Sequence, residues 1–63
     1  MKRVSIYFDG YTLCFSVGSK HKDYPTVDDI IVDGINRLRV YFEDGTFMLY
    51  CNLPFEYHGE TNQ

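Results

Sequence analysis

The chain has 63 residues with nine acidic and six basic side chains, which gives a formal net charge of −3 at pH 7. This length fits one small domain, and the acidic balance argues against non-specific binding of nucleic acid, which depends on neutralising phosphates with Lys and Arg. A hydrophobic content of 44%, with six Tyr and five Phe, argues against intrinsic disorder, and no stretch approaches the roughly 20 apolar residues of a membrane-spanning helix.

The first residues and the cysteines bear on where the chain works. Met1-Lys2-Arg3 leads directly into alternating strand residues rather than into the apolar segment of a signal peptide. The two cysteines, Cys14 and Cys51, allow at most one disulfide and show no metal-ligand spacing with either histidine. We therefore expect a cytoplasmic protein whose cysteines are reduced.

The first part of the chain predicts a β-hairpin centred on Asp9-Gly10. Asp-Gly is the pair that a two-residue type I′ turn prefers, because both of its positions need positive φ. Such a turn places Phe8 opposite Tyr11, and a one-residue slip would mix the two faces of the hairpin. The core face would carry Val4, Ile6, Phe8, Tyr11, Leu13, Phe15 and Val17, and the outer face Arg3, Ser5, Tyr7, Thr12, Cys14 and Ser16.

The middle of the chain predicts one short strand between two connections. Residues 18–25 form a polar loop. Thr26 followed by Asp29 is a helix-start pattern, but the β-branched run Ile30–Val32 and the glycine behind it are poor helix formers. We therefore expect a single helical turn at most, then a strand over Ile30–Val32 and a turn at Asp33-Gly34.

A second hairpin is predicted around Asp44-Gly45. A two-residue loop places Phe42 opposite Phe47, whereas a three-residue loop with a Gly bulge is the competing turn and would mix the two faces. We favour the two-residue loop. The core face would then carry Leu38, Val40, Phe42, Phe47, Leu49 and Cys51, and the opposite face Arg37, Arg39, Tyr41, Met48, Tyr50 and Asn52.

The predicted fold is all-β and built on these hairpins. Phe55–Tyr57 adds a short edge strand after Pro54, which need not donate a ladder hydrogen bond there. Residues 1–57 would form a single β domain, followed by a frayed tail at 58–63. Five or six short strands would lie in one twisted antiparallel sheet or curl into a small SH3-like or OB-like barrel.

Clusters with metal or catalytic chemistry are weak in this sequence. Asp28, Asp29 and Asp33 form the densest acidic group, but they do not match a calcium loop and are expected to be a turn-rich acidic surface. Lys20-His21-Lys22 is expected to be a solvated loop, and neither His21 nor His58 has a catalytic partner at a suitable spacing. We expect no cofactor, no metal and no enzymatic activity.

The most suggestive surface is the predicted outer face of the sheet. It would gather Tyr, Met and Arg, the residue types that are enriched at protein interfaces. The predicted partner-binding residues are Tyr7, Arg37, Arg39, Tyr41, Met48 and Tyr50. If the strands close into a barrel, part of this face is simply its exterior. Aromatics beside arginines also describe single-strand nucleic-acid platforms, so a small nucleic-acid-binding β-barrel is the alternative.

In its size, tyrosine content and acidic balance, the whole chain resembles the short orphan proteins of bacteriophages and mobile elements in low-GC Gram-positive bacteria. Proteins of that kind often bind and block a host protein, including nucleases and defence systems. The resemblance therefore implies an inhibitor that acts by direct binding to a larger protein. Self-association as a homodimer is the other form of protein–protein contact that we expect. The resemblance assigns no functional residue.

Overall fold

The computed structural model describes residues 1–59 and contains six strands and no helix within them. The strands are β1 (Lys2–Phe8), β2 (Tyr11–Ser16), β3 (Val27–Val32), β4 (Arg37–Phe42), β5 (Phe47–Cys51) and β6 (Phe55–Gly59). The predicted all-β fold with short antiparallel strands is confirmed. The strands are divided between two three-stranded sheets, in the orders β2-β1-β6 and β3-β4-β5, and the described residues form no closed barrel.

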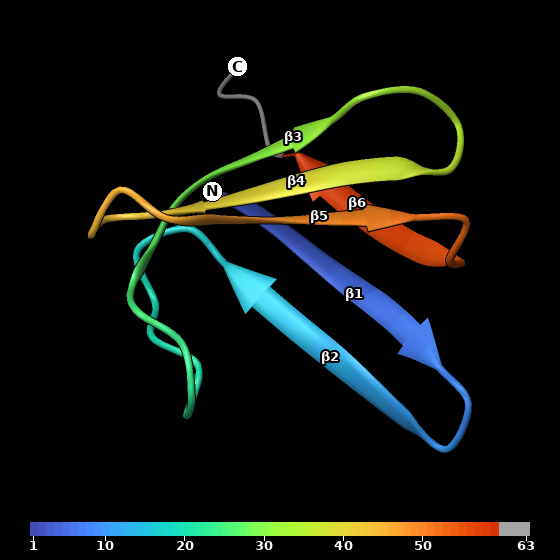
Figure 1. Ribbon diagram of the computed structural model, residues 1–63, viewed down its shortest axis with the longest axis horizontal. Coiled ribbons are helices and arrows are strands. Elements are labelled where there is room, and N and C mark those ends of the chain that lie inside the picture. The colour runs from blue at the N-terminus through green and yellow to red at the C-terminus, as the bar shows by residue number, and fades with distance from the viewer. Residues whose placement is uncertain (60–63) are drawn as a thin grey trace.

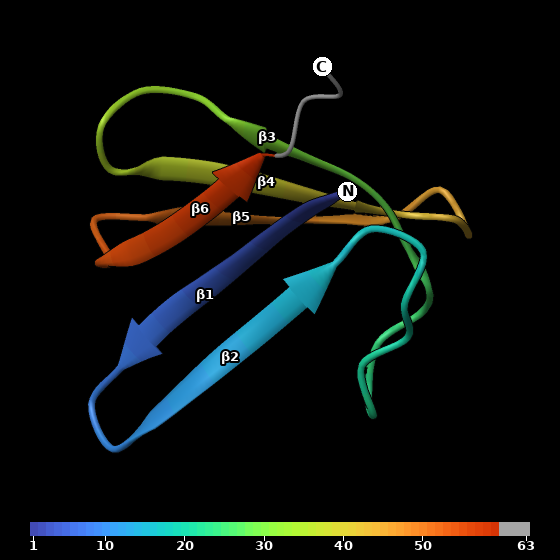
Figure 2. The same cartoon turned by 180° about the vertical axis from the view of Figure 1, so that it is seen from behind.

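The two sheets lie face to face as layers, and their strands cross obliquely (Figures 1 and 2). The chain builds the β1–β2 hairpin, crosses to the other layer for the β3–β4–β5 meander, and returns with β6 alongside β1. The first crossing is held by backbone hydrogen bonds, because Gly18 N–H donates to Val27 and Val27 N–H donates to Ser19. Each sheet therefore contributes one face to a shared core.

The register of the first hairpin is as predicted. Phe8 lies opposite Tyr11, and the pairing continues without a shift to Arg3 opposite Ser16. The turn type differs from the prediction. Of the two loop residues only Gly10 has positive φ, at 97°, whereas a type I′ turn needs positive φ at both positions. The two-residue loop is thus confirmed and the type I′ conformation is wrong.

The register of the second hairpin is wrong by one residue. Tyr41 lies opposite Phe47, and Phe42 N–H donates to the Thr46 carbonyl, so three residues, 43–45, form the loop. Gly45 has a φ of 91° and its N–H donates to the Phe42 carbonyl. This is a type I turn closed by a Gly bulge, the competing turn of the sequence analysis. The Asp44 carboxylate stabilises it by accepting hydrogen bonds from the N–H and hydroxyl of Thr46.

The shift exchanges the two faces of β5, because successive side chains of a strand point to opposite sides. Tyr50 lies in the core with 8% of its surface exposed, whereas Phe47 and Leu49 are 55% and 45% exposed. Cys51 is also exposed rather than buried. The core-face assignment of Phe47, Leu49 and Cys51 is therefore wrong, as is the outer-face assignment of Met48 and Tyr50. On β4 the prediction holds, since Leu38, Val40 and Phe42 are buried.

The segment that could have been a helical turn or a strand is a strand. β3 starts at Val27, three residues earlier than predicted, and pairs with β4 along its length. A β-bulge between Val27 and Asp29 leaves Asp28 without a partner on β4, while Asp29 lies opposite Tyr41. Asp29, which belongs to the helix-start pattern noted in the sequence, lies in this strand instead. Its carboxylate accepts a hydrogen bond from the N–H of Ile30.

The core is built largely from aromatic rings. The Phe15 ring lies 5.2 Å from Tyr24, 5.9 Å from Phe42 and 6.4 Å from Tyr50 between ring centroids. Phe8 extends this group towards the β1–β2 turn, with its ring 6.2 Å from that of Tyr50. Aliphatic side chains fill the space between the layers, namely Val4, Ile6, Leu13, Val27, Ile30, Leu38 and Val40. Large rings let two small sheets bury a continuous core.

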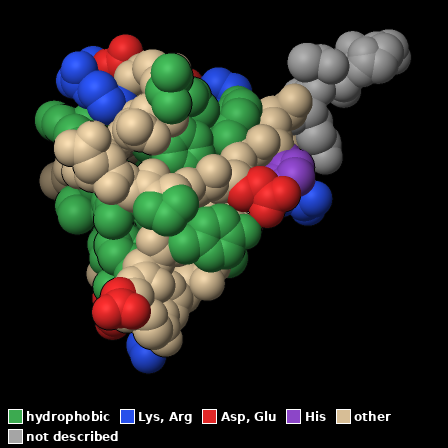
Figure 3. Space-filling model, turned by 90° about the vertical axis from the view of Figure 1, so that its right-hand side faces the viewer, with side chains coloured by type: hydrophobic (Ala, Val, Ile, Leu, Met, Phe, Trp, Pro, Cys, Tyr) green, Lys and Arg blue, Asp and Glu red, His purple; other side chains and the backbone are tan. Residues whose placement is uncertain are grey.

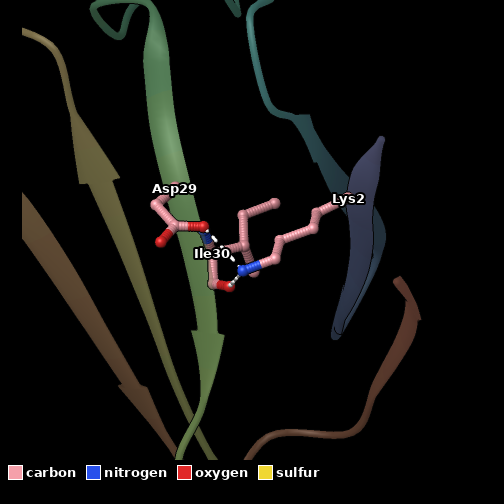
Figure 4. A network of polar contacts seen from close by, with 3 residues as sticks. All are labelled: Lys2, Asp29 and Ile30. Atoms are coloured by element: carbon pink, nitrogen blue, oxygen red, sulfur yellow. Dashed lines mark hydrogen bonds and ion pairs between the residues drawn. The ribbon is translucent and has the colours of Figure 1, made fainter. Parts of the chain in front are cut away.

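A lysine at the edge of the core ties the two layers together (Figure 4). Lys2 reaches from β1 to β3, where its Nζ lies 2.8 Å from Asp29 Oδ1 and 3.3 Å from the Ile30 carbonyl oxygen. Its hydrogen bond lowers the pKa of the Asp29 carboxyl below the ordinary value, and the N–H of Ile30 acts in the same direction, against partial burial. Both side chains are about two-fifths exposed, so the pair is moderately screened by solvent.

The C-terminal strand is longer than predicted. β6 pairs with β1 from Phe55 opposite Ile6 to Gly59 opposite Lys2, so the first two residues of the predicted tail belong to a strand. The rest of that tail, residues 60–63, lies outside the described residues. The Tyr7 N–H donates to the Pro54 carbonyl, which extends the same ladder.

The observed register of β5 makes a direct prediction for stability. Tyr50→Ala should lower the free energy of unfolding by about 3–5 kcal/mol, because it removes a buried ring. Leu49→Ala should lower it by less than about 1 kcal/mol, because that side chain is already half in water. Urea denaturation followed by circular dichroism measures both values. A large loss of unfolding free energy for Leu49→Ala, with little loss for Tyr50→Ala, would instead support the two-residue loop.

The Lys2–Asp29 contact predicts a pH dependence at the acidic end. Because folding lowers the pKa of Asp29, its contribution is fully present above the unfolded pKa of about 3.9 and is lost as the pH falls through the folded value. Asp29→Asn should therefore melt at a lower temperature than the parent at pH 7, and the gap should close below about pH 4. Melting curves at several pH values and constant salt test this. A gap that is constant down to pH 2–3 would contradict it.

Candidate functional site

The structure separates the six predicted partner-binding residues into three places. Arg37, Arg39 and Tyr41 lie together on the outer face of the β3-β4-β5 sheet, the face turned away from the core. Tyr50 is buried between the layers, and Met48 faces the core side of β5 with 38% exposure. Tyr7 lies on the outer face of the other sheet. The predicted surface therefore does not exist as one patch, but its arginine and tyrosine centre does.

Other side chains complete this face, and the sequence analysis placed two of them in the core. Phe47 and Leu49 project from β5 on one side of the arginines, and Ile31 projects from β3 on the other with 41% exposure. We call the set formed by Ile31, Asp33, Arg37, Arg39, Tyr41, Phe47, Leu49 and Cys51 the outer face of β3-β4-β5. The three-residue loop, which the sequence analysis gave as the competing turn, would have placed Phe47 and Leu49 on this face.

The charged groups in the middle of this face are paired with each other. Arg39 donates one hydrogen bond to Asp33 Oδ2 at 2.9 Å and another to the Tyr41 hydroxyl at 3.1 Å. Arg37 lies 3.8 Å from the same Asp33 oxygen. The hydrogen bond to Tyr41 and the charge of Asp33 raise the pKa of Arg39, so its guanidinium remains positive at any physiological pH. Arg39 is therefore tied to a carboxylate and to an aromatic hydroxyl on the same face.

An aromatic contact joins this charged centre to β5. The rings of Tyr41 and Phe47 lie 5.6 Å apart at an interplanar angle of 34°. Tyr41 thus contacts Arg39 through its hydroxyl and Phe47 through its ring. The outer face of β3-β4-β5 therefore combines aromatic, aliphatic and guanidinium groups on one surface. Figure 3 shows the molecule end-on, from the side at which β5 finishes, where hydrophobic side chains cover much of the view and charged groups lie mostly towards its margins.

The outer face of the other sheet is more polar. The Tyr7 hydroxyl donates a 3.0 Å hydrogen bond to Glu56 Oε1, and the same interaction raises the pKa of Tyr7. His58 lies 3.5 Å from Glu56, and the Ser5 hydroxyl lies 3.4 Å from Cys14 Sγ. With Thr12 and Arg3 alongside, this face carries no cluster of exposed aliphatic groups comparable to that of β5.

The acidic and basic clusters noted in the sequence do not converge on a reactive centre. Asp29 is paired with Lys2 and Asp33 with the arginines, while Asp28 is exposed. Residues 1–59 contain no group of three His, Cys, Asp or Glu side chains placed to hold a metal ion, and no pocket. The loop histidine, His21, packs its ring against Phe15 and Tyr24.

No family model, no curated protein and no solved structure matches this chain. Within the part of the chain that the structure describes, no helix is long and apolar enough to span a membrane.

Proposed function

We propose that this chain is a non-enzymatic protein–protein interaction module of the cytoplasm that binds its partner with the outer face of β3-β4-β5. The observation that carries the proposal is the exposure of Ile31, Phe47 and Leu49 around the ordered Arg39–Tyr41 pair. Large apolar side chains that surround an ordered aromatic and a guanidinium group form the composition of an interface centre. The resemblance to small phage proteins favours a host or defence enzyme, inhibited by direct binding, as the partner.

A protein is a better partner for this face than a nucleic acid. Binding to phosphates needs cationic side chains that are free to neutralise them and so release the counterions of the nucleic acid, but Arg39 and Arg37 already share the carboxylate of Asp33. The exposed groups nearest to them are aliphatic as well as aromatic, and aliphatic side chains provide no stacking platform for bases. Two exposed, unpaired cysteines are also suited to a reducing cytoplasm.

Capture from an extract of the organism that encodes the chain tests the proposal. The tagged chain is the bait, the enriched proteins are identified by mass spectrometry, and the strongest one is then purified and titrated by calorimetry. Phe47→Ser combined with Leu49→Ser should weaken its binding by at least about thirtyfold, because exposed anchor side chains are lost while the core is untouched.

The matched control is Tyr7→Ser, which removes an aromatic ring that is 40% exposed on the other sheet. It should leave binding unchanged, and circular dichroism should show that all variants are folded. Equal capture of the same protein by the parent and the double variant would show that the partner does not bind the outer face of β3-β4-β5. Binding of a single-stranded oligonucleotide that weakens steeply with salt would instead support the nucleic-acid alternative.

A further inference from the structure

The free edge of β5 offers backbone groups for binding, in addition to the side chains of the outer face. β5 pairs with β4 on one side and, among the described residues, with no strand on the other. It lies at the border of its sheet in Figure 1. An edge strand of this kind presents unpaired N–H and C=O groups, which form a template for another strand.

The hydrogen-bond pattern identifies which residues supply those groups. Phe42 N–H donates to Thr46 at one end of the β4–β5 ladder, and Asn52 N–H donates to Asn36 at the other. Because an antiparallel ladder alternates residue by residue, Met48 and Tyr50 direct their backbone groups towards β4. The backbone groups of Phe47, Leu49 and Cys51 therefore point to the free edge, from the same residues whose side chains lie on the outer face.

This coincidence distinguishes β5 from the other edge strands. β3 is blunted by two aspartates and a bulge, and β6 carries Glu56 and follows Pro54. Such charges, bulges and prolines are the devices by which edges avoid pairing. β2 has no charge, but the side chains beside its free backbone groups are Thr12, Cys14 and Ser16, which are small. β2 has one large exposed ring, Tyr11 at its turn end, whereas β5 carries two large exposed side chains, Phe47 and Leu49, on the residues that supply its free backbone groups.

We propose that the free edge of β5 pairs antiparallel with β5 of a second copy of this chain, about a twofold axis at Leu49. The proposal rests on the proposed function, which makes this surface an interface, and it adds a second copy of the chain as a binding partner at the edge of that surface. In this register Leu49 lies opposite Leu49 of the second copy and Phe47 lies opposite its Cys51. Each of the three residues exchanges both of its backbone hydrogen bonds across the axis. The result is one six-stranded sheet in which the apolar side chains of the two β5 strands adjoin on the outer face.

Charge favours a second copy in this orientation. No residue of β5 is charged, so self-pairing opposes no like charges within the strand. The acidic turn that contains Glu43 and Asp44 precedes β5, and the antiparallel arrangement sets it beside the uncharged Asn52 and Leu53 of the second copy. A parallel arrangement would place the two acidic turns side by side. A domain of this size buries only about 60% of the surface that its unfolded chain exposes, so contact with a second copy would add to its stability.

Sedimentation equilibrium of the whole chain, from about 1 μM to about 1 mM, is the first measurement. The parent should form a dimer within this range. Leu49→Lys and Leu49→Glu should each raise the dimer dissociation constant by at least about thirtyfold, because like charges then meet on the axis. An equimolar mixture of the two variants should associate again, because opposite charges now face each other. The control Thr12→Lys, on the free edge of β2, should dimerise like the parent.

Crosslinking provides a second measurement that does not depend on charged variants folding well. With Cys14→Ser and Cys51→Ser as the background, Leu49→Cys should form a covalent dimer on mild oxidation, because directly opposed strand positions lie about 5.5 Å apart between Cα atoms, within disulfide range. Thr12→Cys in the same background should remain monomeric. Equal crosslinking of both, or of neither, would refute pairing at Leu49.

The outcomes separate this inference from the proposed function. A parent chain that remains monomeric throughout, or variants at Leu49 that still dimerise, or a mixture that stays monomeric, would overturn the self-pairing of β5. If such a monomer still captures a foreign protein through Phe47 and Leu49, the proposed function is supported although β5 does not pair with itself. If the mixture associates but no foreign protein depends on this face, self-pairing stands and binding of a separate partner does not.

Discussion

The conformation of one turn determines the character of this molecule. The loop at residues 43–45 closes with Gly45 at positive φ and with the carboxylate of Asp44 bound to Thr46, and this fixes β5 against β4. A slip by one residue would exchange every side chain of β5 between the core and solvent. The buried position of Tyr50, the exposed positions of Phe47 and Leu49, and the groups presented at the free edge all follow from it.

The turn also explains how two small sheets share a core. With Tyr50 turned inward, its ring meets Phe8 and Phe15 from the opposite sheet and joins the aromatic group. Its hydroxyl is buried without a hydrogen-bond partner, and burial raises its pKa, so the group stays neutral at an energetic cost. The packing of the ring has to outweigh that cost. Lys2 adds a polar tie between the layers at the rim of the core.

The two hairpins show what the sequence could and could not predict. In the first, small or polar residues such as Thr12 and Ser16 alternate with apolar ones, so one register clearly buries more apolar surface. In the second, β5 reads Phe-Met-Leu-Tyr-Cys and is apolar at every position, so alternation does not identify its inner face. The register of β5 therefore depends on the length of the turn, and Asp-Gly fits both a two-residue and a three-residue loop. The division into two sheets depends on contacts between distant strands, which no local pattern records.

The uninterrupted apolar sequence of β5, which made its register hard to predict, also produces the candidate site. Because all five residues of β5 are uncharged and mostly large, either register leaves apolar side chains in water, and the observed one leaves Phe47 and Leu49 there. A strand that served folding alone would carry polar residues on that side, as β2 does with Thr12. Exposing such groups at an unprotected edge costs free energy, which contact with another chain would recover. On this ground we propose that the site on β5 is half of an interface.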